Sequence, residues 1–152
     1  DKIICVAPDV GGTERARALG KILNVGLAIV DKRRPKPGQS QVMNVIGEVK
    51  GRTCIIVDDI IDSGGTIVNA AKALKSRGAK EVYVYITHGV LSGDAVKKIK
   101  NSVIKNLVIT DTIDNISKTK NVKNIEVLSI SALMGEAIKR ISNSTSVSDL
   151  FK

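Results

Sequence analysis

Two adjacent acidic residues near the middle of this 152-residue chain are placed to contact a ligand. Asp58 and Asp59 directly follow the apolar run of residues 54–57, Cys-Ile-Ile-Val, which predicts a buried strand. A loop of small and polar residues then leads into an expected helix; it consists of Asp62, Ser63, Gly64, Gly65 and Thr66. Because open α/β sheets bind ligands at the carboxyl ends of their strands, we expect a binding site here.

The chemistry of this loop indicates a sugar phosphate. The N–H groups at a helix N-terminus bind anions, and Gly64 and Gly65 let the backbone approach a phosphate closely. Carboxylates cannot bind phosphate directly, but they accept hydrogen bonds from vicinal sugar hydroxyls. An alternative is that Asp62, Ser63 and Thr66 only cap a helix. Capping leaves two adjacent acids unexplained, since their mutual repulsion is costly without a cation or a ligand.

A second strand, glycine loop and helix are expected at the start of the chain. Asp9, Gly11 and Gly12 follow an apolar run and precede a helical pattern. The N–H groups of this loop could hold a diphosphate, and the Asp9 carboxylate is a suitable ligand for Mg²⁺. An ordinary tight turn is the alternative.

A third segment is basic. Lys32, Arg33 and Arg34 precede Pro35, and we expect a mobile loop that could close over a charged transition state. A solvated basic turn is equally consistent with this pattern.

Taken together, these segments closely resemble the ribose-phosphate pyrophosphokinase (phosphoribosyl-diphosphate synthetase) family. The stretches that carry the resemblance are residues 6–17, 29–35, 42–44, 54–67, 87–95 and 146–151. The resemblance runs nearly the whole length of the chain but covers only the family's C-terminal half. It implies that an N-terminal half, which supplies the adenine pocket and a Mg²⁺-binding histidine, is absent. The chain also begins with a strand-like run and no initiator Met, which suggests a missing upstream part.

The resemblance implies a type I phosphoribosyltransferase-like fold and diphosphoryl transfer from Mg-ATP to ribose 5-phosphate, which gives phosphoribosyl diphosphate and AMP. It assigns the 5-phosphate to the loop of residues 62–66 and the ribose hydroxyls to Asp58 and Asp59. Asp9 would ligate Mg²⁺, and Gly11 and Gly12 would face the diphosphate. Lys32 and Arg34 would stabilise the transition state.

The C-terminal tail resembles part of the family's allosteric phosphate or ADP site, and the residues concerned are Ser146, Ser148 and Phe151. Asp149 departs from the family pattern, where an aromatic residue is commoner. His88 is either a contact residue or a structural histidine. The resemblance also implies a homo-oligomer, a hexamer, for the full-length protein.

Two other functions remain open. A non-catalytic sugar-phosphate-binding or regulatory domain would keep the phosphate loop, but it would have no need of Asp9, Lys32 and Arg34. A base phosphoribosyltransferase would need aromatic stacking for a purine, and the chain has only two Tyr, one Phe and no Trp.

The remaining pattern alternates short β-branched runs with helical stretches, which predicts a single α/β domain over residues 1–152. We expect a mainly parallel, twisted sheet with helices on both faces. The expected strands are residues 3–7, 26–30, 41–50, 53–57, 81–87, 107–110 and 126–130. The expected helices are residues 13–23, 66–77, 94–100 and 132–141. Residues 58–65 and 114–124 are expected to be loops.

Composition limits the classes of partner. The net charge is +9, but the lysines are dispersed and aromatic residues make up only 2%, so nucleic acid is not an expected partner. No run approaches the roughly 20 apolar residues of a membrane span. Cys5 and Cys54 each lie in a strand-like run, and two buried thiols indicate a reducing compartment. We therefore expect a cytoplasmic protein that does not bind membranes.

Overall fold

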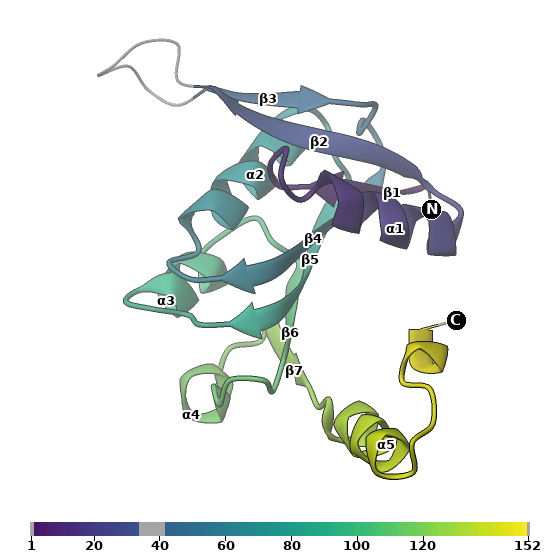
Figure 1. Ribbon diagram of the computed structural model, residues 1–152. Helices are drawn as coiled ribbons and strands as arrows, with labels where there is room; N and C mark the ends of the chain where they lie inside the picture. The colour runs from purple at the N-terminus through teal and green to yellow at the C-terminus, as the bar shows by residue number, and fades with distance from the viewer. Residues whose placement is uncertain (1, 34–41, 152) are drawn as a thin grey trace.

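The computed structural model describes residues 2–33 and 42–151, and only the backbone of Lys32, Arg33 and Val42 within these ranges. The strands are β1 (Ile3–Ala7), β2 (Gly26–Arg33), β3 (Val42–Ile46), β4 (Thr53–Ile61), β5 (Glu81–Gly89), β6 (Asn106–Thr110) and β7 (Ile125–Leu128). The helices are α1 (Thr13–Leu23), α2 (Gly65–Ser76), α3 (Ala95–Lys100), α4 (Ile116–Thr119) and α5 (Ser131–Ser142), followed by a 3₁₀ turn (Ser148–Phe151) (Figure 1).

The described strands form one sheet in the order β3-β2-β1-β4-β5-β6-β7. Only β3 is antiparallel to its neighbour; the other pairs are parallel. The chain leaves β1 toward β2 and β3 on one side, then returns to place β4 on the other side of β1. The strand order therefore reverses between β1 and β4, which is where sheets of this kind bind ligands. The prediction of a mainly parallel α/β fold is confirmed.

The main core lies between the sheet and helices α2 and α3. Ile56 of β4, Val84 of β5, Leu74 of α2 and Ile99 of α3 are fully buried in it. These side chains are aliphatic, as the low aromatic content requires, and branched aliphatic chains can fill an interior to normal density.

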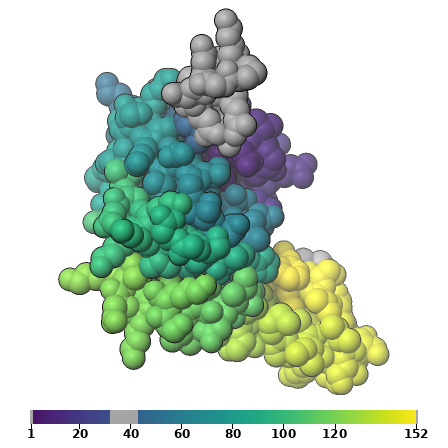
Figure 2. Space-filling view, turned by 90° about the vertical axis from the view of Figure 1, so that its left-hand side faces the viewer, coloured from purple at the N-terminus to yellow at the C-terminus, as the bar shows by residue number. Residues whose placement is uncertain are grey.

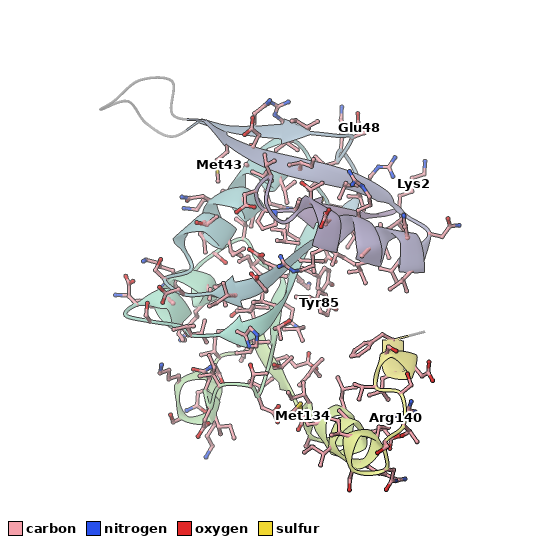
Figure 3. All side chains as sticks on the ribbon, in the orientation of Figure 1. Lys2, Met43, Glu48, Tyr85, Met134 and Arg140 are labelled. Atoms are coloured by element: carbon pink, nitrogen blue, oxygen red, sulfur yellow. The ribbon has the colours of Figure 1, made fainter. Side chains whose placement is uncertain are left out.

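Helix α1 packs on the opposite face of the sheet, over β1, β2 and β4. Helices therefore lie on both faces, as predicted, but the second face is only partly covered. An open apolar groove of about 630 Å³ runs beside α1; it is lined by Leu19, Ile55, Val57, Tyr85, Val108 and Leu128, among others. Tyr85 is seen on this face in Figure 3. Ala16 and Gly20 are the buried residues of α1, whereas Ile22 of the same helix is 80% exposed.

The C-terminal arm, which we define as residues 129–151, projects from one end of the sheet (Figures 1 and 2). It contains α5, which has no buried residue. The exposed large apolar side chains of α5 are Leu133, Met134, Ile138 and Ile141.

Several predicted boundaries were wrong. β4 continues through Ile61, so Asp58 and Asp59 lie within the strand and not in a loop after it. The reason is pairing with β5, which extends to Gly89 and hydrogen-bonds the extra residues. β2 continues through Arg33 because it pairs with β3, so the first basic residues are in a hairpin. The expected loop over residues 114–124 contains the short helix α4. The boundaries of α1 are confirmed.

None of the helices in the described ranges combines the length and the hydrophobicity that crossing a membrane would require.

Both cysteines are buried thiols, as predicted, and we expect them to resist alkylation in the native protein. Cys5 and Cys54 have no exposed surface, and burial raises the pKa of both, that of Cys54 to about 11. Because the thiolate is the reactive form, only about one Cys54 side chain in a thousand would be ionised at pH 8. Iodoacetamide at pH 8, followed by mass spectrometry, should label neither residue until denaturant is added. Rapid labelling of the native protein would contradict this assignment.

Candidate functional site

A cavity of about 220 Å³ opens at the carboxyl end of β4, beside the loop that follows β1. It is lined by Asp9, Asp58 and residues 60–67. The structure thus brings together two separate predicted segments, the Asp9 loop and the loop of residues 62–66, which we call the phosphate loop. They meet because β1 and β4 are adjacent parallel strands, and the carboxyl ends of such strands share one edge of the sheet.

The phosphate loop presents an uncapped helix N-terminus. Gly64 is the N-cap of α2 and has a φ of 75°, in the left-handed region that glycine adopts readily. No side chain makes a capping hydrogen bond to this helix, so the capping interpretation of Asp62, Ser63 and Thr66 is wrong. The N–H groups of the first turn are left without a side-chain acceptor, which makes the end of the helix suited to an anion.

Arg15 of α1 holds the two adjacent carboxylates. Its guanidinium donates from one nitrogen to Oδ1 of Asp58, 2.7 Å away, and from the other to Oδ2 of Asp59, 2.8 Å away. The backbone N–H of Asp59 also donates to Oδ1 of Asp58, at 3.0 Å. This fork fixes the carboxylates of Asp58 and Asp59 beside the cavity, and sequence reasoning gave Arg15 no role.

The two carboxylates have different environments. Burial is the largest influence on Asp58 and, with help from neighbouring Asp59, raises its pKa above the ordinary value. Asp59 is 55% exposed, and its slight desolvation is outweighed by the Arg15 guanidinium and by hydrogen bonds, so its pKa is lowered. Asp58 lines the cavity, whereas Asp59 does not.

This ion pair changes one step of the sequence argument. The repulsion between Asp58 and Asp59 was expected to require a cation or a ligand, and Arg15 is that cation. The charges therefore do not by themselves require a ligand. What favours one is their position, because Asp58 lies in the same cavity as the phosphate loop. A clue in the sequence was the place of Arg15, just inside the helix that follows β1.

The Asp9 loop has a compact internal structure. Oδ1 of Asp9 accepts a hydrogen bond of 2.9 Å from the N–H of Gly12, which is the N-cap of α1. A Cβ on Gly11 would lie 3.3 Å from the same Oδ1, so a small residue keeps this turn close. Within the described ranges no cluster of three or more metal-ligating side chains is present. A single carboxylate fits Mg²⁺, which commonly binds one or two carboxylates, substrate phosphates and water.

The other predicted site residues lie elsewhere or cannot be placed. Lys32 is in β2, where its backbone pairs with Met43. Its side chain and the whole of Arg34 are outside the described residues, so their catalytic roles stay predictions. His88 is exposed on β5, and its Nδ1 lies 2.9 Å from Oγ1 of Thr112, which is consistent with a structural role.

The three predicted allosteric residues lie close together in the chain at the end of the C-terminal arm. The hydroxyls of Ser146 and Ser148 are 2.9 Å apart, and Phe151 is 75% exposed. Arg140 of α5 donates to the Ser146 carbonyl at 2.9 Å and so ties the tail to the helix. None of these residues lines the cavity. Their allosteric role stays a prediction.

Comparison with known proteins identifies the family. Residues 32–152 match the model of the phosphoribosyl synthetase-associated domain. The chain belongs to this family. It is 59% identical over 152 residues to a ribose-phosphate pyrophosphokinase of Hyphomonas neptunium, covering 99% of this chain and 49% of the relative. A Chromobacterium violaceum protein of the same name is 55% identical over 151 residues, covering 99% of this chain and 46% of that one.

Solved structures agree with this assignment to the phosphoribosyl synthetase-associated domain family. The phosphoribosylpyrophosphate synthetase of Mycobacterium smegmatis superposes with a TM-score of 0.85 at 35% identity, over 95% of this chain and 46% of that one. An adenine phosphoribosyltransferase of Saccharomyces cerevisiae has a TM-score of 0.54 at 22% identity, covering 68% of this chain and 66% of that one, which shows the fold alone. The fold is therefore of the type I phosphoribosyltransferase class. The chain spans about half the length of the curated relatives it matches; that this is their C-terminal half stays a prediction.

Proposed function

We propose that the cavity binds ribose 5-phosphate and that this chain is the sugar-phosphate-binding half of a ribose-phosphate diphosphokinase. The observation that carries the proposal is the meeting of Asp9, Asp58 and the uncapped phosphate loop around one cavity. The family membership and the names of the relatives support the same reaction.

In the proposed complex the phosphate loop binds the 5-phosphate through its N–H groups and hydroxyls. The carboxylates accept hydrogen bonds from the vicinal ribose hydroxyls, and Arg15 fixes both acids in place. This arrangement orients the sugar from both ends. Orientation of a reactant supplies a large part of catalysis in phosphoryl transfer.

The proposed reaction transfers a diphosphoryl group. The anomeric hydroxyl oxygen of ribose 5-phosphate forms a bond to the β-phosphorus of ATP, the bond from that phosphorus to the bridging oxygen of AMP breaks, and the hydroxyl proton is released. Asp9 would hold Mg²⁺, which neutralises charge on the diphosphate when bound. Gly11 and Gly12 would face the diphosphate, and Lys32 and Arg34 would stabilise the transition state. ATP is thus a second proposed ligand, and the assembled protein is expected to be a cytoplasmic homo-oligomer.

Isothermal titration calorimetry with ribose 5-phosphate in the presence of Mg²⁺ tests the proposal. We expect saturable binding, weaker binding of arabinose 5-phosphate, whose inverted 2-hydroxyl breaks the cis diol, and still weaker binding of ribose. An absence of ribose 5-phosphate binding by folded protein would exclude the proposed site.

A second candidate is binding without catalysis, because the chain spans only about half of its relatives' length. Release of AMP from ATP, measured in parallel with the titration, separates the two. Binding with AMP release supports a catalytic chain. Binding without AMP release indicates that a second half must supply the nucleotide site.

A further inference from the structure

Residues 90–98, the segment that follows β5, hydrogen-bond to the phosphate loop and to the end of β4. Three successive carbonyl groups at the end of β4 and in the loop accept hydrogen bonds from this segment. The carbonyl of Ile61 accepts from the N–H groups of Val90 and Leu91, at 2.9 and 3.3 Å. That of Asp62 accepts from the N–H of Ser92, at 3.2 Å. The carbonyl of Ser63 accepts from Nζ of Lys98, at 3.4 Å.

These bonds decide the direction of the N–H groups in the loop. In a trans peptide the carbonyl and the following N–H point in opposite directions. A carbonyl that is tied to residues 90–98 therefore turns the next N–H away from that segment. No residue of the 90–98 segment lines the cavity, which lies against the other side of the loop. The segment thus aims successive N–H groups of the loop toward the proposed phosphate position.

The base of this support has a strained backbone. Leu91 has a φ of 51°, a left-handed conformation that costs a residue other than glycine about 1–2 kcal/mol, and its side chain is only 2% exposed. This conformation sets the direction of the Ser92 N–H relative to the Leu91 N–H, and the two donate to successive carbonyls, those of Asp62 and Ile61. Strain of this kind persists where the surrounding structure requires the geometry, and such positions cluster at ligand sites.

Lys98 differs from the other donors of the 90–98 segment because it donates from its side chain, whereas they donate from the backbone. The peptide it holds joins Ser63 to Gly64, whose N–H belongs to the N-cap of α2. Lys98 is itself positioned by an ion pair of 2.8 Å with Asp94, one turn earlier. Helix α3 also lies against the loop, because a Cβ placed on Gly64 would be 3.8 Å from Ala95.

We propose that Lys98 is a positioning residue for the 5-phosphate, acting through the Ser63–Gly64 peptide, and that Asp94 sets its place. This inference rests on the proposed function of the cavity and adds a residue that nothing in the phosphate-loop motif contains. The Lys98 ammonium turns the Gly64 N–H toward the ligand, and its positive charge lies on the far side of the same peptide. Replacement by methionine keeps the aliphatic stem and removes both effects.

The test compares Lys98→Met, Lys98→Arg and a control, Lys97→Met, by calorimetry with ribose 5-phosphate. Lys97 is the exposed neighbour on α3, so its substitution makes the same change in net charge. A charged hydrogen bond lost from the loop predicts about tenfold weaker binding for Lys98→Met. Lys98→Arg should recover affinity to within about threefold of wild type, because arginine keeps a charged donor. Equal affinities for Lys98→Met and Lys97→Met would overturn the proposal.

Two further measurements separate positioning from simple charge. Asp94→Asn leaves the Lys98 charge but loosens its position, so positioning predicts weaker binding, and a pure charge effect predicts equal or tighter binding. Amide hydrogen exchange of Gly64 in the absence of ligand should accelerate in Lys98→Met and not in Lys97→Met. If wild type fails to bind ribose 5-phosphate, the proposed function fails, and unchanged exchange of Gly64 would then also refute the role of Lys98.

Discussion

Replacement of both Asp58 and Asp59 by alanine should remove detectable binding of ribose 5-phosphate. The two carboxylates are the proposed acceptors for the ribose diol. The guanidinium nitrogens of Arg15 lie 2.7 Å from Oδ1 of Asp58 and 2.8 Å from Oδ2 of Asp59, and so hold both acids in place. Two charge-assisted hydrogen bonds of about 1.5–3 kcal/mol each predict at least about a hundredfold loss of affinity. Calorimetry on the double variant measures this loss directly.

The fold should survive this change. Arg15 is 39% exposed, so water can solvate its guanidinium once the acids are gone. Its ion pair with the exposed Asp59 contributes only about 0–1 kcal/mol to stability, and loss of Asp58 also removes the cost of burying that carboxylate. A double control, Glu48→Gln/Glu126→Gln, changes the net charge equally at two exposed positions outside the cavity. The control should bind as wild type does. Wild-type affinity in the Asp58→Ala/Asp59→Ala variant, with both proteins folded, would show that these acids do not contact the sugar.

Thr66→Asp should abolish phosphate binding without destabilising the protein. Thr66 is the second residue of α2, is exposed and lines the cavity. A carboxylate in the first turn of a helix is favourable to the helix by about 0.3–1 kcal/mol, because it interacts with the N-terminal end of the helix dipole. The same carboxylate would occupy the proposed anion site and repel the 5-phosphate. Loss of binding with an unchanged or higher melting temperature is therefore the expected combination.

A matched control for this substitution is Ala132→Asp. Ala132 is the second residue of α5, so the carboxylate has the same position relative to a helix N-terminus, on the C-terminal arm and outside the cavity. Ala132→Asp should leave the affinity for ribose 5-phosphate unchanged. If Thr66→Asp bound ribose 5-phosphate and inorganic phosphate as tightly as Ala132→Asp does, the loop would not be the phosphate site.

Local sequence signals located the two loops that build the cavity. A buried strand, a glycine loop and an amphipathic helix are each recognisable from residues close together in the chain, and this pattern predicted the Asp9 loop, the phosphate loop and the bounds of α1. That both loops serve one reaction was implied only by the family resemblance, and the pairing of β1 with β4 is what brings them to one edge of the sheet. Glycine at position 64 was expected from close approach to phosphate, and its left-handed backbone conformation agrees with this.

Contacts between distant parts of the chain could not be predicted from these local patterns. The continuation of β4 through Ile61 depends on pairing with β5. A strand end that is set by the neighbouring strand cannot be recognised from the residues around it in the sequence. The partial cover of the second face, with its open groove beside α1, depends likewise on where the helices and the C-terminal arm lie.

The sequence alone therefore determined which residues could bind a sugar phosphate, since that depends on residue type and local backbone. Tertiary structure alone decided what holds those residues in place. Arg15 meets Asp58, 43 positions later, only because β1 and β4 are neighbours in the sheet. Lys98 meets Ser63, 35 positions earlier, only because α3 packs against the phosphate loop. The physical reason is that the partner of a charged side chain depends on which distant segments the fold brings together, and no local sequence pattern specifies that.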